Sequence, residues 1–269
     1  MSLLIQTVSY SENAMGMTDT ELIKHAKKLD KKIDKNPDKA KLYIQRGFYR
    51  FLLGDYGSAL EDYNKAEELT PDDSNIFYSR GRIWYERKNY ISAVEDFNKA
   101  LSLNPKDSKT YLSRGLAKDA QGNYNGAISD YDMAIKYYKK NCSAYINRGI
   151  SKSKVKRYES AIKDFKTAIK YSKKYSPDAY YNMGLVKCKL EKYEEGIEDF
   201  TTAIEQNPKY AMAYYQRGLA YLKEDNQQFA KSDLEKAYQL APQNKKIKED
   251  LDKVKETLKN MLKEEEIYY

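Results

Sequence analysis

The residues that could carry out chemistry are few, and their spacing forms no catalytic or metal-binding set. The single histidine, His25, lies in a basic helical segment, so we expect neither a histidine-based triad nor a multi-histidine metal site. Two Ser-x-x-Lys matches, beginning at Ser151 and Ser153, lie in a lysine-rich segment without the companion motifs that give such a match meaning. No glycine-rich phosphate loop occurs. We therefore expect a protein that is not an enzyme and that needs no cofactor or metal.

The cysteine content and hydropathy bear on where the protein resides. Cys142 and Cys188 are too few for a disulfide scaffold, which favours a reducing compartment. No segment approaches the roughly 20 apolar residues that a membrane helix needs. Residues 3–8 are short and lack a basic start, which argues against a signal peptide. We expect a cytoplasmic protein without a membrane span, which is a monomer or a weak dimer.

The elements that would position any binding residues come from one segment repeated along the chain. Residues 74–107 contain two amphipathic helical patterns separated by a break at residues 88–90 and closed by Pro105. A glycine marks each copy at intervals of 34, 34, 34, 35 and 34 residues: Gly47, Gly81, Gly115, Gly149, Gly184 and Gly218. An aromatic residue stands four positions before each glycine, and a small residue stands twelve positions after it. The sequence therefore predicts six helix hairpins in series.

This pattern of aromatic, glycine, alanine, aromatic, alanine and closing proline resembles the tetratricopeptide repeat. The resemblance covers residues 40–244, about three quarters of the chain. It implies an all-α fold, a right-handed α-solenoid of stacked helix hairpins. Two features depart from the pattern, because Lys139 and Lys173 replace the closing proline and Gln227 replaces a tyrosine.

The repeats set the expected domain organisation. Residues 1–17 show no helical period and are expected to be a disordered leader or a remnant of cloning. Thr18 and Glu21 form a capping-box pattern that begins an N-terminal capping helix within residues 18–39. The six repeats then span residues 40–73, 74–107, 108–141, 142–176, 177–210 and 211–244 of one elongated domain. Residues 245–269 are expected to form a C-terminal capping helix to residue 263 and a frayed tail.

An arginine and an aspartate recur at fixed places in the repeats. The residue before the glycine is arginine in five copies and Met183 in the fifth repeat, and aspartate stands fifteen positions after every glycine. In an antiparallel hairpin these two positions lie at a similar height. We therefore predict ion pairs between helices at these positions, with a structural role.

The candidate binding surface is a groove that the resemblance implies, lined by the first helices of successive repeats. Two rows of residues, two positions before and one position after each glycine, are its expected lining: Gln45, Phe48, Ser79, Arg82, Ser113, Leu116, Asn147, Ile150, Asn182, Leu185, Gln216 and Leu219. The first row is polar throughout and suits a peptide backbone, while the second is mostly apolar. The alternative is that the polar row only solvates the helices and the apolar row is core.

Positive charge is concentrated in the fourth repeat, which contains ten basic residues and only two acidic ones, Glu159 and Asp164. The expected basic patch consists of Lys152, Lys154, Lys156, Arg157, Lys163, Lys166 and Lys170. Such a field attracts acidic partners in a salt-dependent way. We predict a protein-interaction scaffold that binds a peptide of a partner protein, an acidic one if repeats three and four take part. The alternatives are a nucleic-acid-associated protein that uses the basic surface of these repeats, and a regulatory or targeting arm of an enzyme complex.

Overall fold

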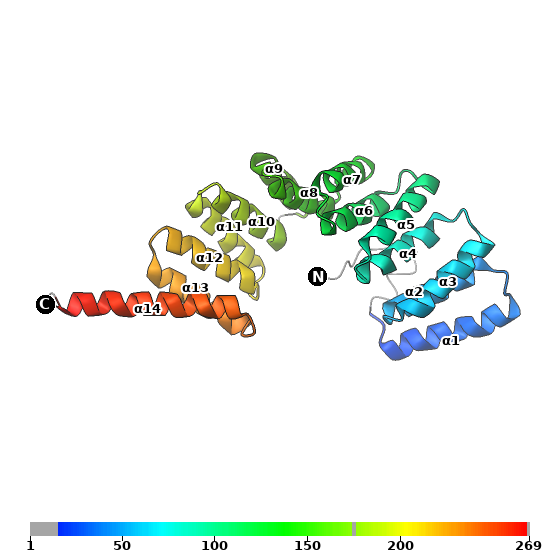
Figure 1. Ribbon diagram of the computed structural model, residues 1–269, viewed down its shortest axis with the longest axis horizontal. Helices are drawn as coiled ribbons and strands as arrows, with labels where there is room; N and C mark the ends of the chain where they lie inside the picture. The colour runs from blue at the N-terminus through cyan, green and yellow to red at the C-terminus, as the bar shows by residue number, and fades with distance from the viewer. Residues whose placement is uncertain (1–15, 174–175, 268–269) are drawn as a thin grey trace. The chain divides into compact units, whose positions relative to one another are not determined.

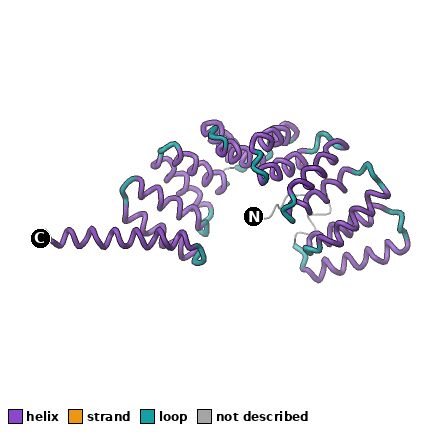
Figure 2. Tube along the Cα trace, in the orientation of Figure 1, coloured by secondary structure: helices purple, strands orange, loops and turns teal. Residues whose placement is uncertain are grey.

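The computed structural model describes residues 16–173 and 176–267, in which all regular secondary structure is helical (Figure 1, Figure 2). Two compact units, Met1–Lys139 and Lys140–Tyr269, divide the chain. The helices of unit 1 are α1 (Asp19–Lys35), α2 (Ala40–Leu52), α3 (Tyr56–Leu69), α4 (Ser74–Glu86), α5 (Tyr90–Leu103), α6 (Ser108–Ala120) and α7 (Tyr124–Tyr137). Those of unit 2 are α8 (Cys142–Lys154), α9 (Tyr158–Tyr171), α10 (Pro177–Lys189), α11 (Tyr193–Gln206), α12 (Ala211–Lys223), α13 (Gln227–Leu240) and α14 (Lys245–Ile267).

The predicted hairpins are present in both units, and the all-α prediction of stacked helix hairpins is confirmed. Within a hairpin the two helices pack along their length, for example α2 on α3 and α10 on α11. Within each unit the second helix of a hairpin also packs on the first helix of the next, as α5 does on α6 and α11 on α12. Helix α1 packs on α2, and α14 packs on α13, so these two helices occupy the places expected for caps.

The helix ends follow local sequence signals. At the start of α1 the Glu21 backbone N–H donates to Thr18 Oγ1, and the Thr18 N–H donates to the Glu21 carboxylate at 2.8 Å, which completes the predicted capping box. Helix α10 begins at Pro177, where the missing N–H of proline costs nothing. The C-terminal helix extends to Ile267, beyond the end predicted at residue 263. Most of the predicted leader, residues 1–15, lies outside the described residues.

The contact that brings the two helices of a hairpin together is between a glycine and an aromatic ring. A Cβ atom on Gly81 would lie 2.8 Å from Cε1 of Phe97, and one on Gly115 would lie 2.6 Å from Cε1 of Tyr131. Both rings are fully buried. In both hairpins the nearest neighbour of the glycine is the ring sixteen residues further along the chain. The glycine is therefore needed for close packing of helix against side chain.

The predicted ion pairs are also present, and the distances between their nitrogen and oxygen atoms are 2.5–2.8 Å. The pairs are Arg46–Asp62, Arg80–Asp96, Arg114–Asp130, Arg148–Asp164 and Arg217–Asp233. The aspartates are buried. Several of the arginines also reach back to the preceding repeat, where Arg80 donates to Asn64 and Arg217 donates to Thr201, each at 2.9 Å. One side chain thus links three helices.

The turn inside each hairpin needs one residue in the left-handed region. Glycine fills this position twice, at Gly54 and Gly122, with φ of 75° and 77°. The other four turns use residues with a side chain at φ of 55–61°: Lys88, Lys156, Glu191 and Asp225. Because a side chain at positive φ is strained, these four turns each reduce stability.

Candidate peptide-binding pocket

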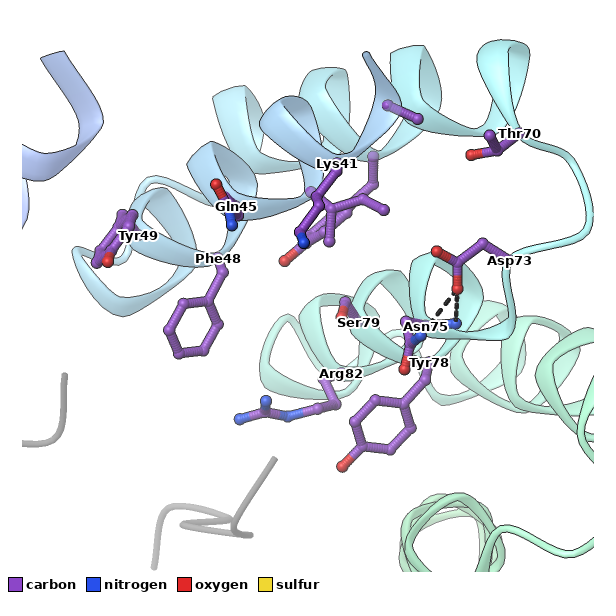
Figure 3. Close-up of a pocket in the computed structure, with 13 residues that line it drawn as sticks. Lys41, Gln45, Phe48, Tyr49, Thr70, Asp73, Asn75, Tyr78, Ser79 and Arg82 are labelled. Carbon is purple, nitrogen blue, oxygen red and sulfur yellow. Dashed lines mark hydrogen bonds between the residues drawn. The ribbon is translucent and has the colours of Figure 1, made fainter. Parts of the chain in front are cut away.

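A pocket of about 320 Å³ lies between α2 and α4 of unit 1 (Figure 3). These are the first helices of two successive hairpins, and their stacking leaves a concave strip between them. Residues of α2 on the pocket side recur at the spacing of one helix face: Lys41, Ile44, Gln45, Phe48 and Tyr49. Helix α4 contributes Asn75, Tyr78, Ser79 and Arg82.

Four of the thirteen residues that line the pocket are aromatic: Phe48, Tyr49, Tyr63 and Tyr78. The rings of Phe48 and Tyr78 stand on its two sides in Figure 3. Tyr63 of α3 also lines the pocket, with 1% of its surface exposed. Burial raises the pKa of the Tyr63 hydroxyl well above its usual range, so this group stays neutral. Such a lining removes apolar surface of a ligand from water.

Arg82 brings a positive charge to the α4 side of the pocket. Its guanidinium carbon lies 4.6 Å from the centre of the Phe51 ring and 5.9 Å from that of Tyr78, both within reach of a cation–π interaction. These contacts hold the side chain against the apolar wall. The Arg82 guanidinium is therefore in contact with aromatic side chains of α2 and α4.

The hydroxyl groups of Tyr78 and Ser113 are both buried. The Tyr78 and Ser113 hydroxyls interact, but neither makes a hydrogen bond of ordinary geometry within the described residues. Burial raises the pKa of Tyr78. Ser113, expected to line the groove, is only 2% exposed, so its side chain belongs to the interior.

The polar rim of the pocket comes from the loop that begins α4. The Asp73 carboxylate caps this helix, because it accepts hydrogen bonds from the Asn75 N–H at 2.9 Å and from the Asn75 side-chain amide at 2.8 Å (Figure 3). Thr70 lies on the same loop. The cap fixes the position of the rim relative to the first turn of α4.

Four of the predicted groove residues line this pocket: Gln45, Phe48, Ser79 and Arg82. Leu116 is half-buried on α6 and does not line it. The lining residues that were not predicted are Ala40, Lys41, Ile44, Tyr49, Tyr63, Thr70, Asp73, Asn75 and Tyr78. Of these, Lys41, Ile44 and Tyr49 lie four residues from Gln45 or Phe48, so helical periodicity alone could have included them.

The predicted groove residues of unit 2 are half-buried on α8, α10 and α12. The amide groups of Asn147 and Asn182 donate to backbone carbonyls four residues earlier in their own helices, at 2.9 Å and 2.8 Å. Leu219 packs against the core formed by α12, α13 and α14. The remaining three are Ile150, Leu185 and Gln216.

The predicted basic patch is divided by the structure into two kinds of residue. The Lys152 ammonium lies 2.7 Å from the buried Asp164 carboxylate, and its side chain is 14% exposed, so it belongs to the hairpin interior. The other members are exposed: Lys154, Lys156 and Arg157 at the turn, and Lys163, Lys166 and Lys170 on α9. Lys174, which also contributes to the charge of this repeat, lies outside the described residues.

Other candidate chemistry has structural explanations. The His25 ring stacks on Tyr49 with centroids 5.1 Å apart, and the histidine is half-buried. Burial raises the pKa of the Cys188 thiol to about 11.

In residues 16–173 and 176–267 no cluster of three metal-ligating side chains occurs. The helices in these ranges are all too short or too polar to cross a membrane.

Sequence models of single repeats match most of the predicted hairpins. Models described as tetratricopeptide repeat match residues 74–107, 143–175, 177–210 and 200–239, and a TPR repeat model matches residues 50–86. The chain belongs to the tetratricopeptide repeat family. Among curated protein sequences, none matches this tetratricopeptide repeat chain.

Solved structures share the fold at low sequence identity. A chain of the APC/C hetero-tetramer Cut9–Hcn1 superposes with a TM-score of 0.70 at 17% identity over 88% of this chain, which covers only 46% of that chain. A tetratricopeptide repeat protein from Parabacteroides merdae ATCC 43184 gives 0.67 at 21% identity, covering 87% of this chain and 93% of that one. YrrB, a TPR protein with an unusual peptide-binding site, gives 0.61 at 21% identity, covering 71% and 98%.

Proposed function

We propose that this tetratricopeptide repeat protein is a non-enzymatic interaction scaffold that binds a peptide segment of a partner protein in the pocket between α2 and α4. The observation that carries the proposal is the aromatic lining of this pocket, with polar groups on its rim. Its volume of about 320 Å³ lies at the lower end of the range for ligand sites, roughly 300–1,000 Å³. This space suits one large side chain of a peptide better than a whole cofactor.

The lining indicates how such a peptide would bind. An apolar or aromatic anchor side chain would pack between Phe48 and Tyr78, because burial of both surfaces is favourable. Gln45 and Ser79 flank the same space and offer an amide and a hydroxyl to the peptide backbone. Arg82 adds a preference for a carbonyl or carboxylate oxygen beside the anchor.

A binding selection tests the proposal. A random peptide library would be selected on the full chain, and the affinities of the recovered peptides would be measured by fluorescence anisotropy. We expect the peptides to share an apolar anchor and to bind Phe48→Ala at least about tenfold more weakly, since interface aromatics often contribute 2 kcal/mol or more. The matched control is Phe229→Ala, which removes an exposed ring of α13 in unit 2.

Unchanged affinity in a folded Phe48→Ala variant would exclude the pocket as the site. The double variant Asn147→Ala/Asn182→Ala tests the predicted groove residues of unit 2 with the same peptides. Loss of binding in that variant, with Phe48→Ala unaffected, would move the site from unit 1 to unit 2. Circular dichroism of each variant confirms that the helices are retained.

A further inference from the structure

We infer that the outer face of α9 is a second docking surface, independent of the pocket, and that it binds a short acidic segment of a partner protein. The surface consists of Lys163, Lys166 and Lys170 on α9 and Lys173 directly after it, and is called the lysine stripe here. All four side chains are exposed. Helix α9 belongs to unit 2 (Figure 1).

The lysine stripe lies on one face of the helix. Positions 163, 166 and 170 are spaced i, i+3 and i+7, so they fall within an arc of roughly 60° at 100° per residue. From position 163 to 170 the helix advances roughly 10 Å at about 1.5 Å per residue, and Lys173, with φ of 56°, follows the end of the helix. A partner with three or four carboxylates over a similar length would match this spacing.

The ammonium groups of these four lysines form no ion pair or hydrogen bond with the residues that the structure describes, whereas that of Lys152 in the same repeat is paired with Asp164. The only exposed acidic side chain of α9 is Glu159, one turn before the stripe. Like charges three or four residues apart destabilise a helix. The stripe therefore costs stability and gains nothing from contacts within the described chain.

The fold does not require lysine at these positions. The residues that correspond to Lys163 and Lys170 are Glu61 and Glu68 in the first repeat, and Glu198 and Glu205 in the fifth. The residue that corresponds to Lys166 is Asn64 in the first repeat, and it accepts a hydrogen bond from Arg80 of the next repeat. In the fifth repeat the arginine position is Met183, so no guanidinium is brought toward Lys166. The fourth repeat thus has Lys166 at the position where the first repeat has an asparagine that binds the arginine of the next repeat, and the repeat after the fourth lacks that arginine.

The neighbouring charges restrict the partner to a short segment. The next outer helix of unit 2, α11, exposes Glu194, Glu195, Glu198 and Glu205. A long nucleic acid or an anionic membrane carries negative charge beyond the stripe and would be repelled there. The stripe also contains no arginine and no exposed aromatic ring, which are the usual groups for phosphate forks and base stacking. A short acidic protein segment need not extend to the glutamates of α11, and it needs neither arginine nor an aromatic ring for its recognition.

The test uses a labelled 15-residue helical peptide with glutamate at positions i, i+3, i+7 and i+10. Its affinity for the full chain would be measured by fluorescence anisotropy at low salt. We expect the variant K163Q/K166Q/K170Q/K173Q to bind about tenfold more weakly, since several exposed ion pairs with the peptide are lost. Binding to the wild type should weaken as salt is added.

Three controls separate this surface from nonspecific charge and from the pocket. The variant K24Q/K28Q/K31Q/K35Q removes the same charge from exposed positions of α1, where Asp19, Glu21 and Asp34 are interspersed, and should bind normally. The Phe48→Ala variant should also bind this peptide normally. The same peptide with glutamine in place of glutamate should not bind.

The inference is overturned if the glutamate peptide fails to bind the wild type at millimolar concentration, or if the stripe variant binds as tightly as the wild type. Equal loss in the α1 variant would also overturn it, because net charge would then explain the result. A 20-nucleotide RNA or vesicles containing phosphatidylserine serve as competing probes. If either binds more tightly than the peptide and depends on the same four lysines, the partner class is wrong.

Discussion

The Lys187 ammonium lies 2.8 Å from the Asp199 carboxylate, in the one repeat whose arginine position is occupied by methionine. Both residues are buried. Lysine from one turn further along α10 therefore supplies the charge that arginine supplies in the other five hairpins. Burial raises the pKa of Asp199, and Lys187 opposes this shift.

Removal of this lysine should destabilise unit 2. We expect Lys187→Met to lower the free energy of unfolding by about 3 kcal/mol, because Asp199 would stay buried without a cation. The control is Lys192→Met, whose ammonium lies 3.8 Å from Glu195 at an exposed site and should change stability by less than about 0.5 kcal/mol. Urea unfolding of both variants provides the comparison, and equal losses would contradict the expectation.

Two helical glycines should respond in opposite ways to the same substitution. Gly115→Ala would place Cβ 2.6 Å from the buried Tyr131 ring, so we expect a loss of about 2 kcal/mol. Gly57 of α3 has nothing within 4 Å of the same position, and Gly57→Ala should raise stability by about 0.5–1 kcal/mol through helix propensity. Thermal unfolding of the two variants would show whether the signs differ as expected.

The left-handed turn position offers a second pair of opposite substitutions. Lys88 has φ of 60°, and Lys88→Gly should raise the free energy of unfolding by about 0.5–1 kcal/mol because the backbone strain is relieved. Gly122 has φ of 77° with open space around it, so Gly122→Ala should lower that free energy by about 1 kcal/mol. If Lys88→Gly proves destabilising in urea unfolding, the lysine side chain must contribute more than the strain costs.

Gly196 replaces the alanine found at this position in the other five repeats, and Cys188 explains the change. A Cβ on Gly196 would lie 2.6 Å from Cys188 Sγ. We expect Gly196→Ala to lower stability by about 2 kcal/mol, and Cys188→Ala in the same chain to restore most of the loss. A double-mutant cycle measures this coupling, which should be close to zero if the two sites are independent.

The C-terminal helix should be held less firmly in acid. The Tyr215 hydroxyl donates to Asp250 of α14 at 2.8 Å. Burial raises the pKa of Asp250, but hydrogen bonds from Tyr215 and Lys246 outweigh this effect and hold the pKa below its usual range. A carboxylate with a lowered folded pKa stabilises the folded state above its unfolded pKa of about 4, and that contribution is lost as the pH falls through the folded value.

We therefore expect Asp250→Asn to be less stable than the wild type at pH 6 and to approach it below about pH 4. Chemical unfolding over this pH range measures the difference between the two proteins. Asp252→Asn, at an exposed position of the same helix, is the control and should follow the wild-type pH dependence. A constant difference between Asp250→Asn and wild type at all pH values would show that the Asp250 charge is not responsible.

Much of the fold could be predicted because each repeat carries the same residue types at the same spacing. The spacing of glycine, alanine and aromatic residues predicted the hairpins, and the fixed separation of Arg80 and Asp96 predicted an ion pair between helices. The capping box at Thr18 was also predictable, because it depends on residues only three positions apart. A residue spacing that recurs in six copies is strong evidence for a repeated helix hairpin.

The candidate site could be predicted only in part. Gln45 and Phe48 follow from their place beside a glycine, but the contribution of Tyr63 depends on how closely α3 approaches α2. Ser113 has the same repeat position as Ser79, yet its side chain is buried and interacts with the Tyr78 hydroxyl. Likewise, residue type does not distinguish Lys152, which turns inward to Asp164, from Lys163, which faces solvent.

By itself, the sequence determined the repeat length, the helix hairpins, the ion pairs within them and the concentration of positive charge in the fourth repeat. These features depend on the order and spacing of residues along one chain segment. Only the tertiary structure decided that a pocket forms between α2 and α4, that His25 stacks on Tyr49 and that Lys152 turns inward to Asp164. Such features depend on the rotation and separation of neighbouring helices, which side-chain packing sets and which no short sequence pattern encodes.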